Sequence, residues 1–391
     1  MTAPPAGRPA RLPALTGMRF FAAALVFFFH AMYQVFFSSA GAQAKYTSVF
    51  GRAGYLGVGF FFVLSGFILT WTARDTDTAP RFWRRRVCKI WPNHLITFVV
   101  AFILLAKVVH ATNNLKYAAA NVLLVQAWFP DLNINNGYNS ISWSLSCEAL
   151  FYLLFPVLLV LIRRIPARLL WACALGVTAL VFLVPVAAQL LPHQQDVPFA
   201  PASEDQFWFI YFFPPVRLLD FVLGIIVARI VISGRRVPLG LGGSLAVAVA
   251  AYALAPVVFP AKATLVAVMI LPTALVIANA AQTDAQARPT WLSSRVMVWL
   301  GEISFAFYLW HFMVLNYGHR ALGLTRHWST PAAFGVIALL LGVTVLLSWL
   351  LYSLVENPVM KRFSVARSAR RSAAAPPVPE PVPAVARPEM P

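Results

Sequence analysis

The sequence has a polar residue, His30, inside an apolar segment, where helix packing alone does not require a polar side chain. His30 lies inside the apolar run 20–37, eleven residues after Arg19. An imidazole in such a run loses solvation free energy unless a partner compensates it, and ionisable side chains inside apolar spans are functional by default. The sequence therefore predicts that His30 is a catalytic base.

Glu148 is the predicted partner of that base. It lies about six residues past the outer start of its apolar segment, and His30 lies seven residues before the outer end of the first one. At 1.5 Å per residue both side chains are roughly 10 Å deep, so a His30–Glu148 pair is physically possible. A carboxylate that orients an imidazole is a usual partner of a general base. The alternative is that each residue satisfies a separate buried polar network.

Basic residues gather on the other side of the predicted membrane. Arg19 lies about three helical turns, roughly 16 Å, from His30 along the same segment. The run 81–92, RFWRRRVCKIWP, contributes four more candidates: Arg84, Arg85, Arg86 and Lys89. Guanidinium groups bind phosphate through paired hydrogen bonds, so we predict that these five residues hold the phosphates of a cytosolic donor. The alternatives are a snorkelling anchor for Arg19 and lipid headgroup contact for the run.

Three further polar residues are expected to line the site. Ser65 belongs to a span rich in small residues, GYLGVGFFFVLSGFILTWT, which favours close helix packing first and a narrow cleft for an acyl chain or cofactor arm second. Tyr308 and His311 are spaced i,i+3 and so share a helix face. His311 is either a site-lining group or a structural hydrogen-bonding group. The histidines and cysteines lack metal-ligand spacing, so we expect no metal and no permanently bound cofactor.

The elements that must position these residues are membrane helices. Of all residues, 60% are hydrophobic and 11% are charged. Apolar segments long enough to cross about 30 Å of hydrocarbon recur along the chain. The fold class expected is an all-α, polytopic membrane bundle of about ten helices, near residues 15–37, 54–73, 90–110, 142–162, 168–190, 213–233, 241–258, 262–281, 296–318 and 332–355.

The loop charges predict the orientation of this bundle. The apolar segment 117–129 has only about 13 residues, too few for a confident span, and is expected to be re-entrant, interfacial or broken. If it does not cross, 23 of the 31 Lys and Arg residues lie on the side of both termini. The positive-inside rule then places both termini in the cytoplasm of a cell with this protein in its plasma membrane. The net charge of +18 follows from this bias and does not indicate nucleic acid.

Composition also divides the chain into a membrane domain and two tails. Residues 1–11 and 364–391 are rich in Pro, Ala and Arg and are expected to be disordered cytoplasmic tails. Residues 12–363 form the expected membrane domain, and no second soluble domain fits between its spans.

Taken together, the motifs resemble the acyltransferase family 3 of integral membrane acyltransferases. LTGMRFFAAALVFFFH has that family's Arg-x10-His pattern, and GVGFFFVLSGFILT, the arginine-rich run, WSLSCEALFYLLFP, GEISFAFYLWH and VENP follow in order. The family often has the pattern Arg-x-x-Arg three residues before a proline. In this sequence the proline is Pro92, and the pair before it is Arg86 and Lys89. Lysine keeps the positive charge but lacks the planar fork through which arginine pairs with a phosphate.

The resemblance implies an integral membrane O-acyltransferase in a lipid bilayer, with the first-helix histidine catalytic. Acyl-coenzyme A is the implied donor, of an acetyl or short-chain group. The compact length resembles single-domain members that acylate macrolide antibiotics or their sugars, so the expected acceptor is a hydroxyl of a sugar, glycoconjugate or macrolide-type natural product. The rival interpretation is a non-enzymatic transporter or flippase of a lipid-linked or glycosylated molecule, because buried polar residues also mark transport paths.

Overall fold

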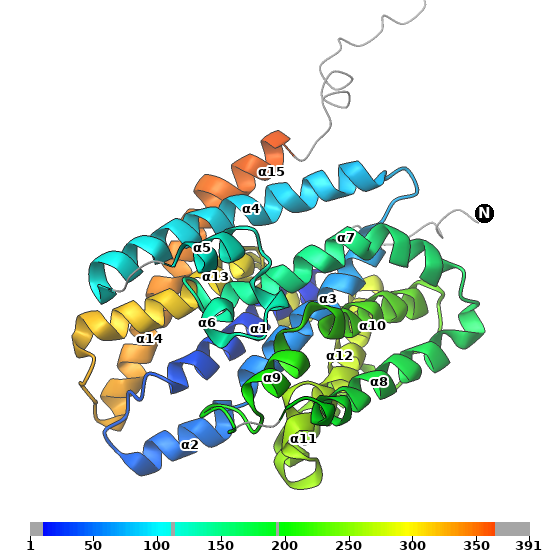
Figure 1. Ribbon diagram of the computed structural model, residues 1–391. Coiled ribbons are helices and arrows are strands. Elements are labelled where there is room, and N and C mark those ends of the chain that lie inside the picture. Colours follow the sequence, from blue (N-terminus) through cyan, green and yellow to red (C-terminus); the bar gives the residue numbers. More distant parts are fainter. Residues whose placement is uncertain (1–10, 111–113, 193–194, 364–391) are drawn as a thin grey trace, which may run out of the picture.

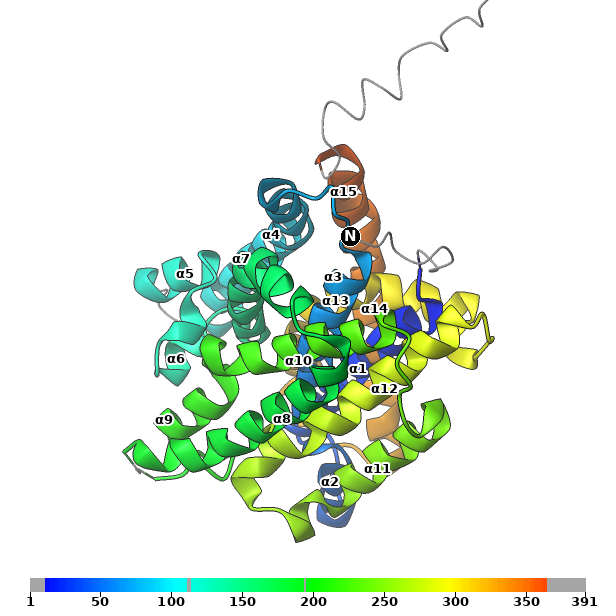
Figure 2. The same ribbon diagram turned by 90° about the vertical axis from the view of Figure 1, so that its right-hand side faces the viewer.

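The protein is a bundle of long helices. The computed structural model describes residues 11–110, 114–192 and 195–363, and within these ranges it has helices and no β-strand. The long helices lie side by side, as the two views in Figures 1 and 2 show. The expected all-α membrane bundle is therefore confirmed. The predicted tail 364–391, and all of the tail 1–11 except its last residue, lie outside the described residues.

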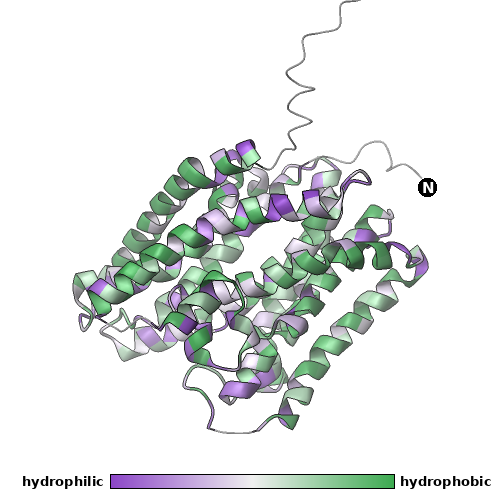
Figure 3. Cartoon of the chain, turned by 45° about the horizontal axis from the view of Figure 1, so that its top comes forward, coloured by the Kyte–Doolittle hydropathy of each residue, from purple (hydrophilic) through white to green (hydrophobic). Residues whose placement is uncertain are grey.

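Ten helices of the described chain have at least 18 residues. They are α1 (Pro13–Met32), α3 (Ala53–Thr72), α4 (Ala79–Leu104), α7 (Trp143–Arg163), α8 (Leu170–Ala187), α10 (Pro214–Ile232), α11 (Gly240–Val258), α12 (Ala267–Ala285), α13 (Arg295–Gly323) and α14 (Thr330–Leu351). Nine spans that include all of these helices except α10 are long and apolar enough to cross a membrane. Apolar residues cover most of the helix lengths, and hydrophilic ones concentrate towards the ends and loops (Figure 3).

Helix α10, the long helix outside those nine spans, has 19 residues and carries a buried ion pair. Arg217 and Asp220 lie 2.6 Å apart, and each side chain is only 1% exposed. The Arg217 guanidinium also lies over the rings of Phe62 and Tyr211, at 5.1 and 5.5 Å from their centroids. A charge can remain in an apolar bundle when an opposite charge and aromatic faces compensate it. Helix α10 packs against α3, α7, α8 and α12 inside the bundle, which supports ten crossings.

The short apolar piece 117–129 does not form a spanning helix. It is divided between α5 (Leu115–Val122) and the single turn η2 (Gln126–Trp128). Eight helical residues reach about 12 Å, well short of the hydrocarbon thickness. The other short helices are α2 (Ala40–Phe50), α6 (Leu132–Asn135), α9 (Glu204–Phe207) and α15 (Asn357–Phe363), with single turns η1 (Leu105–Val109), η3 (Ser140–Ser142), η4 (Ala167–Leu169), η5 (Ala188–Leu190), η6 (Trp208–Phe212), η7 (Ala261–Leu265), η8 (Trp291–Ser293) and η9 (Tyr352–Glu356).

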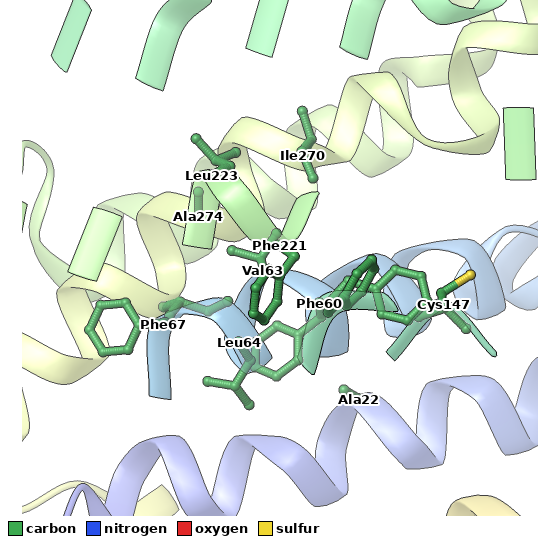
Figure 4. Close-up of a cluster of buried hydrophobic side chains, with 14 of the residues drawn as sticks. Ala22, Phe60, Val63, Leu64, Phe67, Cys147, Phe221, Leu223, Ile270 and Ala274 are labelled. Atoms are coloured by element: carbon green, nitrogen blue, oxygen red, sulfur yellow. The ribbon is translucent and has the colours of Figure 1, made fainter. Parts of the chain in front are cut away.

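Close packing of α3 explains most of its small residues. A Cβ atom added at Gly66 would lie 2.0 Å from the carbonyl oxygen of Phe221 in α10, and one added at Gly224 would lie 2.0 Å from that of Val63 in α3. Figure 4 shows Val63 and Phe221 within the buried cluster that α3 shares with α10, α12 and α1. Backbones this close require glycine on both helices. The expectation of close packing is confirmed at these positions.

Valine at Gly66 should therefore destabilise the bundle. The added side chain must push α3 away from α10, and overpacking of this kind costs about 1–3 kcal/mol. We expect a lower melting temperature of the purified protein in detergent. Gly176→Val in α8 is the matched control, because nothing lies within 4 Å of a Cβ at that position. Equal melting temperatures for the two variants would contradict the packing interpretation.

Candidate active site

Two cavities lined by the described residues contain the predicted site residues, and the first of them is basic. It has a volume of about 190 Å³ and lies between α1, α3, α4, α7 and α13. Its charged and polar lining residues are Thr16, Arg19, Ser65, Arg86, Lys89, Ser144, Glu148, Tyr152, Ser304 and Tyr308. Three cations and one carboxylate make this cavity suited to an anionic ligand.

Helix α4 divides the basic run between the cavity and the surface. Arg86 and Lys89 are spaced i,i+3 and so lie on the same face, which lines the cavity. Arg84 is exposed, and the Arg85 guanidinium donates two hydrogen bonds to the Asp77 carboxylate at 2.9 and 2.8 Å. Of the five predicted donor-binding residues, the structure thus brings Arg86 and Lys89 together with Arg19 and leaves the other two outside the cavity.

Glu148 lies among these cations. The Tyr152 hydroxyl, one turn further along α7, donates a hydrogen bond to Glu148 Oε2 at 2.8 Å. The charges of Lys89, Arg19 and Arg86 all act on the Glu148 carboxylate. Tyr152 was not among the predicted site residues, although its i,i+4 spacing from Glu148 indicates that the two side chains share a helix face.

The structure does not bring Glu148 into the same cavity as His30. The sequence predicts that His30 and Glu148 lie at equal depths only if the helix of Glu148 starts at the membrane surface. Instead, Ser142 is fully buried and Trp143, the first residue of α7, is 5% exposed, because the short elements of 115–142 pack around that end. The depth obtained by counting residues from the start of α7 is therefore too small, and Glu148 lies closer to the basic cavity than the sequence predicts.

The second cavity is aromatic and contains His30. Its volume is about 270 Å³, and aromatic residues make up ten of its eighteen lining residues: Phe29, Tyr33, Tyr55, Trp143, Phe199, Phe207, Tyr211, Phe212, Tyr308 and Phe312. The polar lining includes His30, Gln34, Asn136 and Ser140, and none of the described lining residues is Asp, Glu, Lys or Arg. Such a cavity suits a neutral ligand with apolar faces and a few hydroxyls.

His30 is held by contacts on one edge of its ring. Its Nδ1 lies 3.0 Å from the Val26 carbonyl oxygen, one turn earlier in α1, and 3.0 Å from Nε2 of His311 in α13. Nδ1 of His311 in turn lies 2.6 Å from the Tyr308 carbonyl oxygen. His311 is fully buried behind His30. The structure thus places His311 next to the predicted base.

The two cavities meet at Tyr308. Tyr308 and Val58 line both of them. The Tyr308 hydroxyl is 3.0 Å from the Ser144 hydroxyl and donates to the Ile141 carbonyl oxygen at 3.2 Å. The side chain of Tyr308 therefore lies between the basic cavity and the cavity that contains His30. Among the other predicted lining residues, Ser65 lies in the basic cavity.

The chain is similar to known acyltransferases over most of its length. A family model described as an acyltransferase domain matches residues 12–353. Acyltransferase MdmB of Streptomyces mycarofaciens is 43% identical over 363 residues, which cover 90% of this chain and 93% of that protein. O-acetyltransferase OatA of Staphylococcus aureus is 29% identical over 41% of this chain and 27% of its own length.

A further relative matches this chain almost end to end. The putative peptidoglycan O-acetyltransferase YrhL of Bacillus subtilis is 24% identical over 89% of this chain and 55% of its own length. No solved structure matches.

Proposed function

Because this chain belongs to the acyltransferase family 3, whose model spans residues 12–353, we propose that it moves an acetyl or short-chain acyl group from acyl-coenzyme A to a hydroxyl of a sugar, glycoconjugate or macrolide-type natural product. One observation carries this proposal. A basic cavity and an aromatic cavity that contains His30 meet at Tyr308, so an anionic donor and a neutral acceptor have separate approaches to one base.

The basic cavity is the proposed donor site. Arg19, Arg86 and Lys89 bind the donor's phosphates, and the negative charge of Glu148 offsets the repulsion among these three cations. Arg19 and His30 are eleven residues apart on α1, about 16 Å, a separation that an extended pantetheine arm can bridge. The thioester then lies near the junction of the cavities. The similarity to the O-acetyltransferase OatA and to the putative peptidoglycan O-acetyltransferase YrhL supports a short acyl group.

The aromatic cavity is the proposed acceptor site. Aromatic rings pack against the apolar faces of sugars and macrolactones, and the few polar residues orient a hydroxyl. A volume of about 270 Å³ encloses one ring of an acceptor rather than a whole macrolide. We therefore propose that the hydroxyl-bearing ring enters the cavity while the rest of the acceptor stays outside it.

The reaction that this arrangement supports is a direct transfer. Nε2 of His30 takes the proton of the acceptor hydroxyl while its oxygen bonds to the thioester carbonyl carbon. The carbon–sulfur bond breaks, and the proton on His30 passes to the departing thiolate. The products are an ester and free coenzyme A.

Incubation of the purified protein with acetyl-coenzyme A and a panel of hydroxylated macrolides tests the proposal. We expect release of free thiol together with a macrolide that gains the mass of an acetyl group. Longer donors such as palmitoyl-coenzyme A should react more slowly, since both cavities are small. The same assay with hydroxylated sugars and glycoconjugates covers the other acceptors of the proposal. Absence of thiol release with every acyl-coenzyme A and every acceptor tested would overturn the proposal.

Both termini are proposed to lie in the cytoplasm, with the protein in the plasma membrane. Cysteines at Thr76 and Pro201, both exposed, test this orientation in a background in which Cys88, Cys147 and Cys173 are replaced by alanine. A membrane-impermeant thiol reagent applied to intact cells should label Pro201→Cys and spare Thr76→Cys. The reverse pattern would place the termini outside.

A further inference from the structure

His311 and His30 form a pair whose protons can be assigned from their neighbours. A carbonyl oxygen only accepts hydrogen bonds, so the 2.6 Å contact with the Tyr308 carbonyl requires a proton on Nδ1 of His311. A neutral imidazole carries one proton, and Nε2 of His311 is then an acceptor. It faces Nδ1 of His30 at 3.0 Å.

The other contact of His30 independently assigns the proton of His30 to Nδ1. Its Nδ1 also lies 3.0 Å from the Val26 carbonyl oxygen, a second group that only accepts. Nδ1 of His30 therefore carries the proton and shares it between two acceptors. Nε2 keeps its lone pair and has no hydrogen-bonding partner among the described residues, while His30 itself lines the aromatic cavity.

We infer that His311 is the positioning residue of this acyltransferase, which holds His30 as the tautomer with its Nε2 lone pair free for the acceptor hydroxyl. The inference rests on the proposed function, in which His30 is the base. It gives His311 the orienting role that a carboxylate has in other acyl-transfer sites. Glu148 lines the other cavity, where Tyr152 and the cations surround it.

His311 also has a role after the proton has moved. When Nε2 of His30 takes the hydroxyl proton, the imidazolium keeps its Nδ1–H bonds to His311 Nε2 and to the Val26 carbonyl oxygen. Two acceptors on one N–H stabilise the positive charge until the thiolate takes the proton. His311 is itself poorly placed to be the base, because it is fully buried, lines neither cavity and has both nitrogens engaged.

Two substitutions at His311 separate positioning from packing. His311→Phe keeps a flat ring next to Phe307, which stacks on His311 with an interplanar angle of 9°, but it removes the acceptor. His311→Gln can place Oε1 where Nε2 stands and so accept from His30. We expect kcat to fall on the order of 10²-fold in the phenylalanine variant, with both KM values little changed, and to recover largely in the glutamine variant.

The assay uses acetyl-coenzyme A and the best acceptor of the macrolide panel, with full-length protein whose gel-filtration profile matches the wild type. His94→Gln is the matched control, since His94 is fully buried, hydrogen-bonded through Nε2 to the Asn121 carbonyl oxygen at 3.0 Å, and lines neither cavity. Wild-type kcat in His311→Phe, or equal losses in the phenylalanine and glutamine variants, would overturn the inference. Failure of the proposed function would instead appear as an inactive wild type.

Discussion

Replacing His30 with alanine should lower the turnover of acyl transfer about 10²- to 10⁴-fold, the contribution typical of a general base. Removing the imidazole leaves no other unengaged base in the aromatic cavity as described, because its remaining lining residues are aromatic, aliphatic or neutral polar. The measurement is release of free coenzyme A from acetyl-coenzyme A, together with the mass of the acylated acceptor.

The matched substitution is Gln34→Ala. Gln34 lies four residues after His30, in the turn that follows α1, and lines the same cavity, but it cannot take a proton. We expect it to change the acceptor's KM and to leave kcat within a few-fold of the wild type. Both variants should insert and purify normally, since His30 and Gln34 line an existing cavity. Wild-type turnover in His30→Ala would rule out the proposed base.

Alanine at Arg86 or Lys89 should raise the donor's KM about 10- to 100-fold, because a hydrogen bond between charged groups contributes about 1.5–3 kcal/mol. The acceptor's KM should stay nearly constant, since these side chains line the basic cavity and not the aromatic one. Steady-state kinetics with varied acetyl-coenzyme A measures the effect. Arg81→Ala is the control on the same helix, where the side chain is exposed.

Lys89→Arg is the sharper probe of the same cavity. A planar guanidinium can pair with a phosphate through two hydrogen bonds, so this variant should lower the donor's KM if Lys89 contacts phosphate. If the basic residues only contact lipid headgroups, all of these variants should bind the donor like the wild type. That result would leave Arg19 as the remaining candidate for binding the donor's phosphates.

The sequence was sufficient to predict the class of fold and the residue types of the site. Long apolar segments at about 1.5 Å per residue predict membrane helices whatever their packing. The described residues form ten helices of at least 18 residues, and nine of these lie in spans long and apolar enough to cross a membrane. The isolated His30 and the i,i+3 pair of Tyr308 and His311 stood out because polar groups in apolar spans need partners. Membership of the acyltransferase family, expected from the ordered motifs, is confirmed over residues 12–353.

Partners between helices were decided by the tertiary structure. Spacing along one helix predicts which residues share a face, but it does not predict how deep a second helix begins, and the buried start of α7 shifted Glu148 into the basic cavity. The same limit applies to the basic run, because the sequence did not distinguish its four candidate cations, and only Arg86 and Lys89 face the basic cavity. His311 and His30 are 281 positions apart in the sequence, and the packing of α13 on α1 brings them into contact. Local propensity and hydropathy act within a segment, whereas a hydrogen bond between segments depends on their relative depth and rotation, which packing determines.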